Sequence, residues 1–198
     1  MAVDDGFAAI QVVLREREAR DRRWWEDMRD CFAEDSFVAL TWYQGSGNGF
    51  VDGSAAMAAA GSRTRHRIGP PVVRGTGDRA VISLPLVIES YAPVDGVECV
   101  LSTYARHLYR LERRGGAWKI TRLDAIYERD ALAPAVPGQV ARIDPAELEG
   151  LRSPYRLLAW KFRRSGHDVP QDLPGDDRPE DVARIYAEAF AWAGVPQP

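Results

Sequence analysis

The start of the chain follows a helical pattern of apolar and polar residues. Phe7, Ile10, Val13 and Leu14 recur at helical spacing, and two aspartates before them suit the N-terminus of a helix. A second helix is predicted over about residues 24–33, with its large apolar residues along one stripe. The next segment, "SFVALTWY", changes to strand-like residues. The chain is therefore expected to open with two helices and a strand.

Turn signals then divide the middle of the chain. "GSGNG" predicts a turn or a mobile loop, and "DGSAAMAAAG" predicts a short helix that ends at Gly61, with Asp52 or Ser54 near its cap. From His66 onward come four strand-like segments, "HRIGPPVVRG", "DRAVISLPLVIESYA", "VECVLSTYARHLYRLER" and "AWKITRLDAIYER". Their separators, "GTGD", "PVDG" and "RRGG", are hairpin signals and predict antiparallel pairing.

Helices followed by a long strand meander predict an α+β fold. Strands of this length are expected to twist and curl around the N-terminal helices. Beyond Tyr127 the composition shifts to Pro, Ala and Gly, which predicts a linker or wrapping arm, and amphipathic helices are predicted near residues 154–164 and 179–193. We divide the chain into a domain over residues 1–132 and a Pro-rich arm with a helical C-terminal extension over residues 133–198.

The composition of the chain argues against some kinds of binding partner. The 198 residues carry a formal charge of −3, which argues against a general nucleic-acid binder. There is no apolar run of the roughly 20 residues needed to span a bilayer, and acidic residues stand where a signal peptide would be basic. We therefore expect a cytoplasmic protein with neither membrane nor nucleic acid as a partner. Cys31 and Cys99 lack the spacing of a zinc site and suit reduced, buried thiols.

Three segments together resemble a known family. In their order and spacing, "EARDRRWWEDMRDCFAEDSFVAL", "RTRHRIG" and "YRLERRGGAWKITRL" resemble the SnoaL-like branch of the nuclear transport factor 2 superfamily. The resemblance covers roughly residues 5–132. It implies a cone-shaped curved antiparallel sheet, wrapped by N-terminal helices around an internal cavity, and a homodimer or homotrimer. The same cone hosts dehydratases, dehydrochlorinases, isomerases, cyclases, epoxide hydrolases and non-catalytic subunits, so it does not fix the activity.

The resemblance also implies catalytic residues. Around Asp21 and His66 the chain is similar to scytalone dehydratase and hexachlorocyclohexane dehydrochlorinase, which pair an aspartate with a histidine. It implies that Asp21 orients His66, and that His66 removes an activated C–H proton as a general base. Arg122 matches a cavity arginine of the dehydrochlorinase, and His107 a polar cavity residue of the dehydratase. Both are expected to stabilise an oxyanion or a leaving group. Arg20 stands in place of a dehydratase tyrosine.

Without the resemblance, the same residues also fit structural roles. His66 would cap a strand, Asp21 would pair with the arginine-rich helix end, Arg122 would form a surface salt bridge, and His107 would be a core histidine. Strand alternation places His107 on the face with smaller residues, which suits a cavity wall. Aromatic and neighbouring residues would line that cavity or simply form the core. These candidate substrate-binding residues are Trp24, Trp25, Trp42, Tyr43, Phe50, Thr103 and Tyr109.

The sequence thus predicts a cofactor-independent lyase or isomerase, without a metal site, for a small hydrophobic oxygenated molecule. One alternative is a non-catalytic ligand-binding cone or a structural β-type subunit of a ring-hydroxylating dioxygenase, because "SRTRH" is also typical of those subunits. Another is an epoxide hydrolase, in which Arg122 and Asp124 would supply part of an Asp–Arg–Asp arrangement around a water. A polyketide cyclase is a further alternative.

Overall fold

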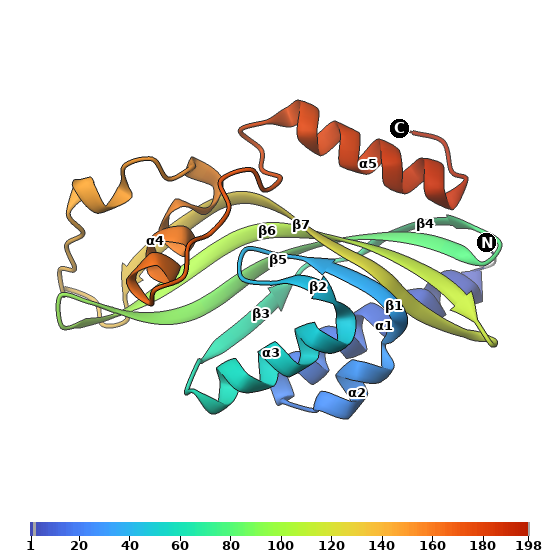
Figure 1. Cartoon of the computed structure of the whole chain (residues 1–198), viewed down its shortest axis with the longest axis horizontal. Coiled ribbons are helices and arrows are strands. Elements are labelled where there is room, and N and C mark those ends of the chain that lie inside the picture. Colours follow the sequence, from blue (N-terminus) through green and yellow to red (C-terminus); the bar gives the residue numbers. More distant parts are fainter. Residues whose placement is uncertain (2, 198) are drawn as a thin grey trace.

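The computed structural model describes residues 1 and 3–197, and the side chains of residues 1 and 5–197 (Figure 1). The helices are α1 (Val3–Arg22), α2 (Trp25–Asp30), α3 (Gly47–Ala59), α4 (Arg156–Arg164) and α5 (Pro179–Ala193). The strands are β1 (Phe32–Ala39), β2 (Gln44–Ser46), β3 (Thr64–Ile68), β4 (Val72–Thr76), β5 (Arg79–Val94), β6 (Val97–Arg114) and β7 (Ala117–Pro134). Two short 3₁₀ helices, Pro145–Leu148 and Ser153–Tyr155, precede α4. In the described part of the chain, no helix is long and apolar enough to cross a membrane.

The strands form one curved, unclosed sheet in the order β2-β1-β7-β6-β5-β3, and β4 pairs with a second stretch of β5. The predicted hairpins β5–β6 and β6–β7 are antiparallel, as expected. β1, however, runs parallel to β7, with Val38 opposite Leu123. The sheet is therefore mixed: the expected curved antiparallel sheet is present, and the pairing of β1 with β7 adds one parallel pair to it. Turn residues report only the pairing of consecutive strands, and no turn joins β1 to β7.

Helices cover both faces of the sheet. Figure 1 shows α1, α2 and α3 on one side and α5 on the other. The face towards α1 carries alternate residues of β6, and Thr103, Ala105, His107 and Tyr109 are all buried there, as the alternation predicts. On the opposite face, α5 packs its apolar stripe against Val81 and Leu108 of the sheet. The α+β class with an N-terminal helical layer is thus confirmed.

The glycine-rich segment "GSGNG" is ordered rather than a loop. Its first residues form β2, and α3 begins at Gly47. The hydroxyl of Ser46 accepts a hydrogen bond from the Gly49 N–H at 3.1 Å and caps the helix. The predicted cap at Asp52 or Ser54 is therefore wrong. A Cβ at Gly47 would lie 2.7 Å from the ring of Phe32, so close packing explains the glycine there.

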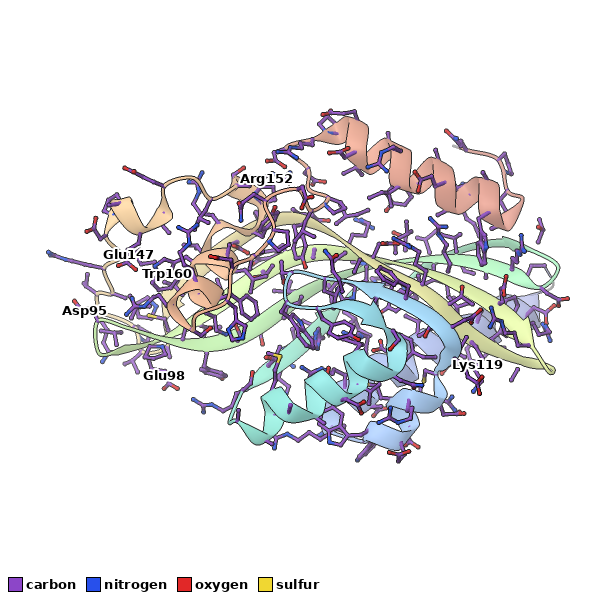
Figure 2. All side chains as sticks on the ribbon, in the orientation of Figure 1. Asp95, Glu98, Lys119, Glu147, Arg152 and Trp160 are labelled. Atoms are coloured by element: carbon purple, nitrogen blue, oxygen red, sulfur yellow. The ribbon has the colours of Figure 1, made fainter. Side chains whose placement is uncertain are left out.

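Contacts within the C-terminal extension, and between the extension and the sheet, hold it in place. The indole N–H of Trp160 donates a hydrogen bond to the Glu147 carboxylate at 2.8 Å, and Figure 2 shows the two side chains in this part of the chain. The ring of Tyr155 lies 5.1 Å from that of Tyr127 on β7. Both predicted helices of the extension are present, as α4 and α5. Strand β7 continues to Pro134, past the residue at which we placed the change of composition.

Asp130 of β7 also holds α4 in place. Its carboxylate accepts a hydrogen bond from the backbone N–H of Leu158, in the first turn of α4, at 2.9 Å. Burial raises the pKa of Asp130 to about 6, although the hydrogen bond from Leu158 acts to lower it. A carboxyl group in an unfolded chain has a pKa near 3.9. Since the folded pKa is the higher one, the folded state favours the protonated form of Asp130.

We predict that Asp130→Asn stabilises the protein more at high pH than at low pH. The contribution of the protonated carboxyl group is complete below the unfolded pKa and is lost as the pH rises through about 6. Asparagine keeps an acceptor for Leu158 and does not ionise. Urea unfolding of both proteins at about pH 4 and about pH 8 measures the difference. Asp168→Asn, at an exposed loop residue, is the control. An equal difference at both pH values would contradict the prediction.

Candidate active site

A cavity of about 880 Å³ lies between the sheet, the N-terminal helices and α4. Its polar floor is formed by side chains of α1, β3 and β6, and much of its wall is apolar. A cavity of this size, mostly apolar with a few convergent polar groups, is the usual form of a small-molecule site. The lining residues used below are Arg17, Arg20, Trp42, Phe50, His66, His107, Tyr127, Lys161 and Phe162.

Asp21 and His66 meet at the floor of this cavity. Asp21 lies in the last turn of α1, and His66 lies in the middle of β3, which pairs with β5. The Nδ1 atom of His66 lies 2.7 Å from one Asp21 oxygen, and the His66 backbone N–H donates to the other at 2.8 Å. Because an ionised carboxylate only accepts, Nδ1 carries the proton and Nε2 keeps its lone pair. The carboxylate therefore fixes both the position and the tautomer of the imidazole.

His66 is held in its neutral form. Its ring is buried, and burial lowers the pKa below the ordinary histidine value. The hydrogen bond to Asp21 raises the pKa, while the positive charge of Arg17 lowers it, and the net shift is downward. A neutral imidazole is the form that accepts a proton, and Nε2 of His66 is its basic nitrogen. In this structure the lone pair of Nε2 accepts a hydrogen bond from Nη1 of Arg17 at 3.3 Å, because a guanidinium only donates.

A buried ion pair adjoins the dyad. Glu16 and Arg17 are both almost completely buried, and the Arg17 guanidinium donates to the Glu16 carboxylate through two of its nitrogens. The third, Nη1, lies 3.3 Å from His66 Nε2. Burial acts to lower the pKa of Arg17, but Glu16 more than offsets this, so the guanidinium stays charged. A fixed positive charge therefore stands beside the atom of His66 that would take a proton.

The same carboxylate anchors a chain of hydrogen bonds to His107. The Tyr109 hydroxyl donates to Glu16 at 3.2 Å, and its oxygen lies 3.4 Å from His107 Nδ1. Since the Tyr109 proton points to Glu16, Nδ1 of His107 is the donor in the second contact, which leaves Nε2 as an acceptor. Within the described residues Nε2 is buried without a partner, and burial holds the pKa of His107 well below its usual range. We expected His107 to stabilise an oxyanion, which requires a hydrogen-bond donor. The network instead makes Nε2 of His107 an acceptor.

Tyr127 offers the complementary polar group. Its hydroxyl oxygen accepts a hydrogen bond from the Thr41 N–H at 3.0 Å, and its ring lines the cavity. Its own proton has no acceptor among the described residues. Burial raises the pKa of Tyr127 to about 12, so the hydroxyl stays protonated. The cavity therefore presents an acceptor at His107 and a donor at Tyr127.

The structure brings together some of the predicted site residues and separates others. His66, His107, Trp42 and Phe50 line the cavity, and Asp21 stands behind His66. Tyr109 does not line the cavity, but its hydroxyl contacts His107, which does. The remaining predicted binding residues do not line it: Trp24 is half exposed at the surface, and Trp25, Tyr43 and Thr103 lie in or beside the core.

Arg122 is not a cavity arginine. It pairs with Asp124 at 2.6 Å and lies over the ring of Phe37, on the face of the sheet opposite His107. A β-bulge explains the difference: Ile120 faces inward opposite Leu111, but Arg122 pairs with Arg110, so one extra residue reverses the alternation. The predicted role for Arg122 is therefore wrong. Arg122 and Asp124 also do not supply the Asp–Arg–Asp arrangement that an epoxide hydrolase would need in this cavity.

Sequence reasoning missed several residues of the site. Glu16, Arg17 and Arg20 belong to "REREARDRR", a run of charges of the kind that usually forms a solvated helix face. The spacing of Arg17 and Asp21, four residues apart, was the available signal that both occupy one face of α1. The extension also contributes to the cavity through Lys161 and Phe162 of α4, although its sequence carries no chemical motif.

Known proteins resemble this chain in sequence and in fold. The SnoaL-like domain model matches residues 4–124. A PEP2-like protein from Fusarium vanettenii is 30% identical over 187 residues, which cover 87% of this chain and 78% of that protein. Because 87% of the chain is longer than residues 4–124, the similarity to the fungal protein extends past residue 124 into the C-terminal extension.

Two solved structures share the fold at low sequence identity. One, from Novosphingobium aromaticivorans, is described as a "Putative Scytalone Dehydratase"; it is 14% identical, with a TM-score of 0.54 over 72% of this chain and 97% of that chain. The other, from Streptomyces avermitilis, is described as a "putative dehydratase from the NTF2-like family"; it is 18% identical, with a TM-score of 0.52 over 62% of this chain and 94% of that chain.

Proposed function

Since the chain belongs to the SnoaL-like domain family, we propose that it is a lyase or isomerase of the dehydratase type. Its substrate would be a small hydrophobic molecule with a carbonyl group and an adjacent acidic C–H bond. The observation that carries the proposal is the 2.7 Å contact between Asp21 and His66 Nδ1, which fixes the imidazole at the wall of a largely apolar cavity. The two solved structures described as dehydratases share the fold and add support.

The proposed first step is proton abstraction. His66 Nε2 takes the proton from the carbon next to the substrate carbonyl, and the electrons of the broken C–H bond move onto the carbonyl oxygen. Asp21 stabilises the imidazolium that forms. Nη1 of Arg17 donates to Nε2 at 3.3 Å before the reaction. Once Nε2 takes the substrate proton it no longer accepts this hydrogen bond, and the Arg17 guanidinium would donate to the enolate oxygen instead. Arg17 thereby takes the part that the sequence assigned to Arg122.

The second step decides the class of reaction. In a dehydration, the enolate expels a hydroxyl from the next carbon, and the proton held by His66 leaves with it as water. In an isomerisation, His66 returns the proton to a different carbon and nothing leaves. His107 Nε2 would accept a hydrogen bond from a substrate hydroxyl, and Tyr127 would donate to a carbonyl oxygen. All of these steps use side chains of this chain alone.

A general carbon acid tests the first step without knowledge of the natural substrate. We expect the protein to accelerate exchange of the acidic C1 protons of 2-tetralone with D₂O, measured by proton NMR against buffer. The base must be neutral, and burial lowers the pKa of His66. The exchange rate should therefore rise with pH through an apparent pKa below the ordinary value of about 6.5 and stay level above it. A rate that begins to rise only above neutral pH would contradict His66 as the base.

Elimination is tested next with cyclic β-hydroxy ketones of similar size. Water loss from these compounds indicates a dehydratase, whereas exchange without water loss indicates an isomerase. Absence of both reactions, with binding of the same compounds, would favour the ligand-binding cone instead.

A further inference from the structure

The cavity contains a positive charge that the dyad does not use. Arg20 lies one residue before Asp21 on α1, is 8% exposed and lines the cavity. Its guanidinium forms no ion pair within 4.0 Å and no hydrogen bond with the described residues. Its closest aromatic neighbour is Trp25, with the guanidinium carbon 5.8 Å from the ring centre. A buried charge without a partner is costly, so its presence in a ligand cavity calls for a partner from the ligand.

The nearby carboxylates are already engaged. Both oxygens of Asp21 accept hydrogen bonds from His66, and those of Glu16 accept from Arg17 and Tyr109. These acids act on Arg20 only from a distance, while Arg17 and Arg23 repel it. Burial and the charge of Arg17 lower the pKa of Arg20 to about 10, and it remains protonated at neutral pH. The guanidinium therefore keeps its donors for a group inside the cavity.

The other cations of the cavity differ from Arg20 in position or pairing. Arg63, at the rim, is paired with Glu98 at 2.7 Å, and Figure 2 labels Glu98 at the end of the sheet near the extension. Lys161 of α4 lines the cavity and has no ion pair among the described residues. Its amine, however, is a single charge at the end of a long, flexible lysine side chain. Arg17 is also buried on α1, but Glu16 and His66 accept its hydrogen bonds. Among the described cations of the cavity, Arg20 combines burial and a fixed place on α1 with a planar fork of donors that have no partner.

We propose that Arg20 forms an anion subsite, and that the natural ligand is a hydrophobic carboxylate. A carboxylate matches the guanidinium fork in a bidentate pair, and the apolar wall around Trp42 and Phe50 suits a ring system. The inference deepens the proposed function and rests on it for the reaction: the substrate would be a cyclic carboxylic acid that also carries the carbonyl group. Binding of the carboxylate itself does not depend on the chemistry of His66.

The test compares two probes of the same shape, 2-naphthoate and 2-naphthamide, by isothermal titration calorimetry at neutral pH. We expect wild-type protein to bind the carboxylate at least about tenfold more tightly than the amide. Arg20→Met, which keeps length and removes charge, should weaken naphthoate binding by about 10- to 100-fold and change naphthamide binding little. Arg20→Lys should keep part of the preference. Because the substitution removes an unpaired buried charge, thermal unfolding of Arg20→Met should not shift to lower temperature.

Matched variants locate the anion and separate the two proposals. Lys161→Met should keep the preference for naphthoate; if it loses the preference while Arg20→Met keeps it, the anion binds at α4 and the subsite is wrongly placed. His66→Ala should also keep the preference, because the subsite does not use the imidazole. A wild-type protein that prefers naphthoate but does not accelerate 2-tetralone exchange overturns the proposed reaction and not the subsite. Wild-type protein that binds both probes equally, or binds neither, overturns the anion subsite.

Discussion

Replacement of His66 by alanine is expected to reduce the enzyme-dependent exchange of 2-tetralone protons by about 10²–10⁴-fold, the usual contribution of a positioned general base. The reason is geometric, because within the described residues His66 Nε2 is the neutral basic nitrogen that a carboxylate orients towards the cavity. His107 also lines the cavity, but its pKa is lowered further by burial and it lacks a carboxylate partner. It is therefore not expected to replace His66 as the base. Proton NMR in D₂O measures the exchange.

Two further measurements separate loss of the base from loss of the fold. Added imidazole should restore part of the exchange in His66→Ala, because the substitution leaves space beside the cavity. Asp21→Asn should also slow exchange, since an amide does not stabilise the imidazolium and does not fix the Nδ1–H tautomer. Circular dichroism should show that both variants are folded. Exchange at the wild-type rate in a folded His66→Ala variant would exclude the proposed dyad.

The main elements of the fold were predictable because their signals are local. Hairpin turns define the long strands β5, β6 and β7, and alternation along β6 identifies the face that carries His107. The parallel pairing of β1 with β7 is not a local property, and no residue pattern reports it. The ordered start of α3 was missed because glycine is typical both of loops and of close packing, as at Gly47.

The dyad and the rest of the site differ in how far the sequence determines them. Asp21 and His66 are 45 residues apart, and family resemblance, rather than spacing, joined them. Glu16 and Arg17 lie in a run with charges on every helical face, so the sequence does not show which charges turn inward. Arg122 was assigned to the cavity by resemblance to the dehydrochlorinase. The structure places it on the other face after a single-residue bulge, and a bulge of this kind leaves no glycine or proline signal at Thr121.

The C-terminal extension adds residues to the cavity that lie outside the matched family domain. The family model ends at residue 124, yet α4 completes the cavity with Lys161 and Phe162. The fungal relative shares sequence with this part of the chain. Residues of α4 therefore join those of the family domain in setting the size and charge of the ligand, while α1 and β3 supply the proposed chemistry.

Glu16→Gln is expected to cost about 3–5 kcal/mol of folding free energy, the usual effect of removing one partner from a buried ion pair. The substitution changes few atoms, but it leaves the Arg17 guanidinium in a site where its side chain is 3% exposed and no other carboxylate of the described residues bonds to it. It also weakens the acceptor for Tyr109, on which the orientation of His107 depends. Small domains are stable by only about 5–15 kcal/mol, so this loss would be a large share of the total. Urea unfolding measures it.

Two further variants distinguish the loss of the ion pair from a general sensitivity of α1 to substitution. Glu18→Gln, at an exposed position of the same helix, should change the free energy of unfolding by less than about 0.5 kcal/mol. The double variant Glu16→Gln/Arg17→Met removes both charges, and it should be more stable than Glu16→Gln alone because no unpaired buried cation remains. A double variant less stable than the single one would mean that Arg17 contributes through packing rather than charge.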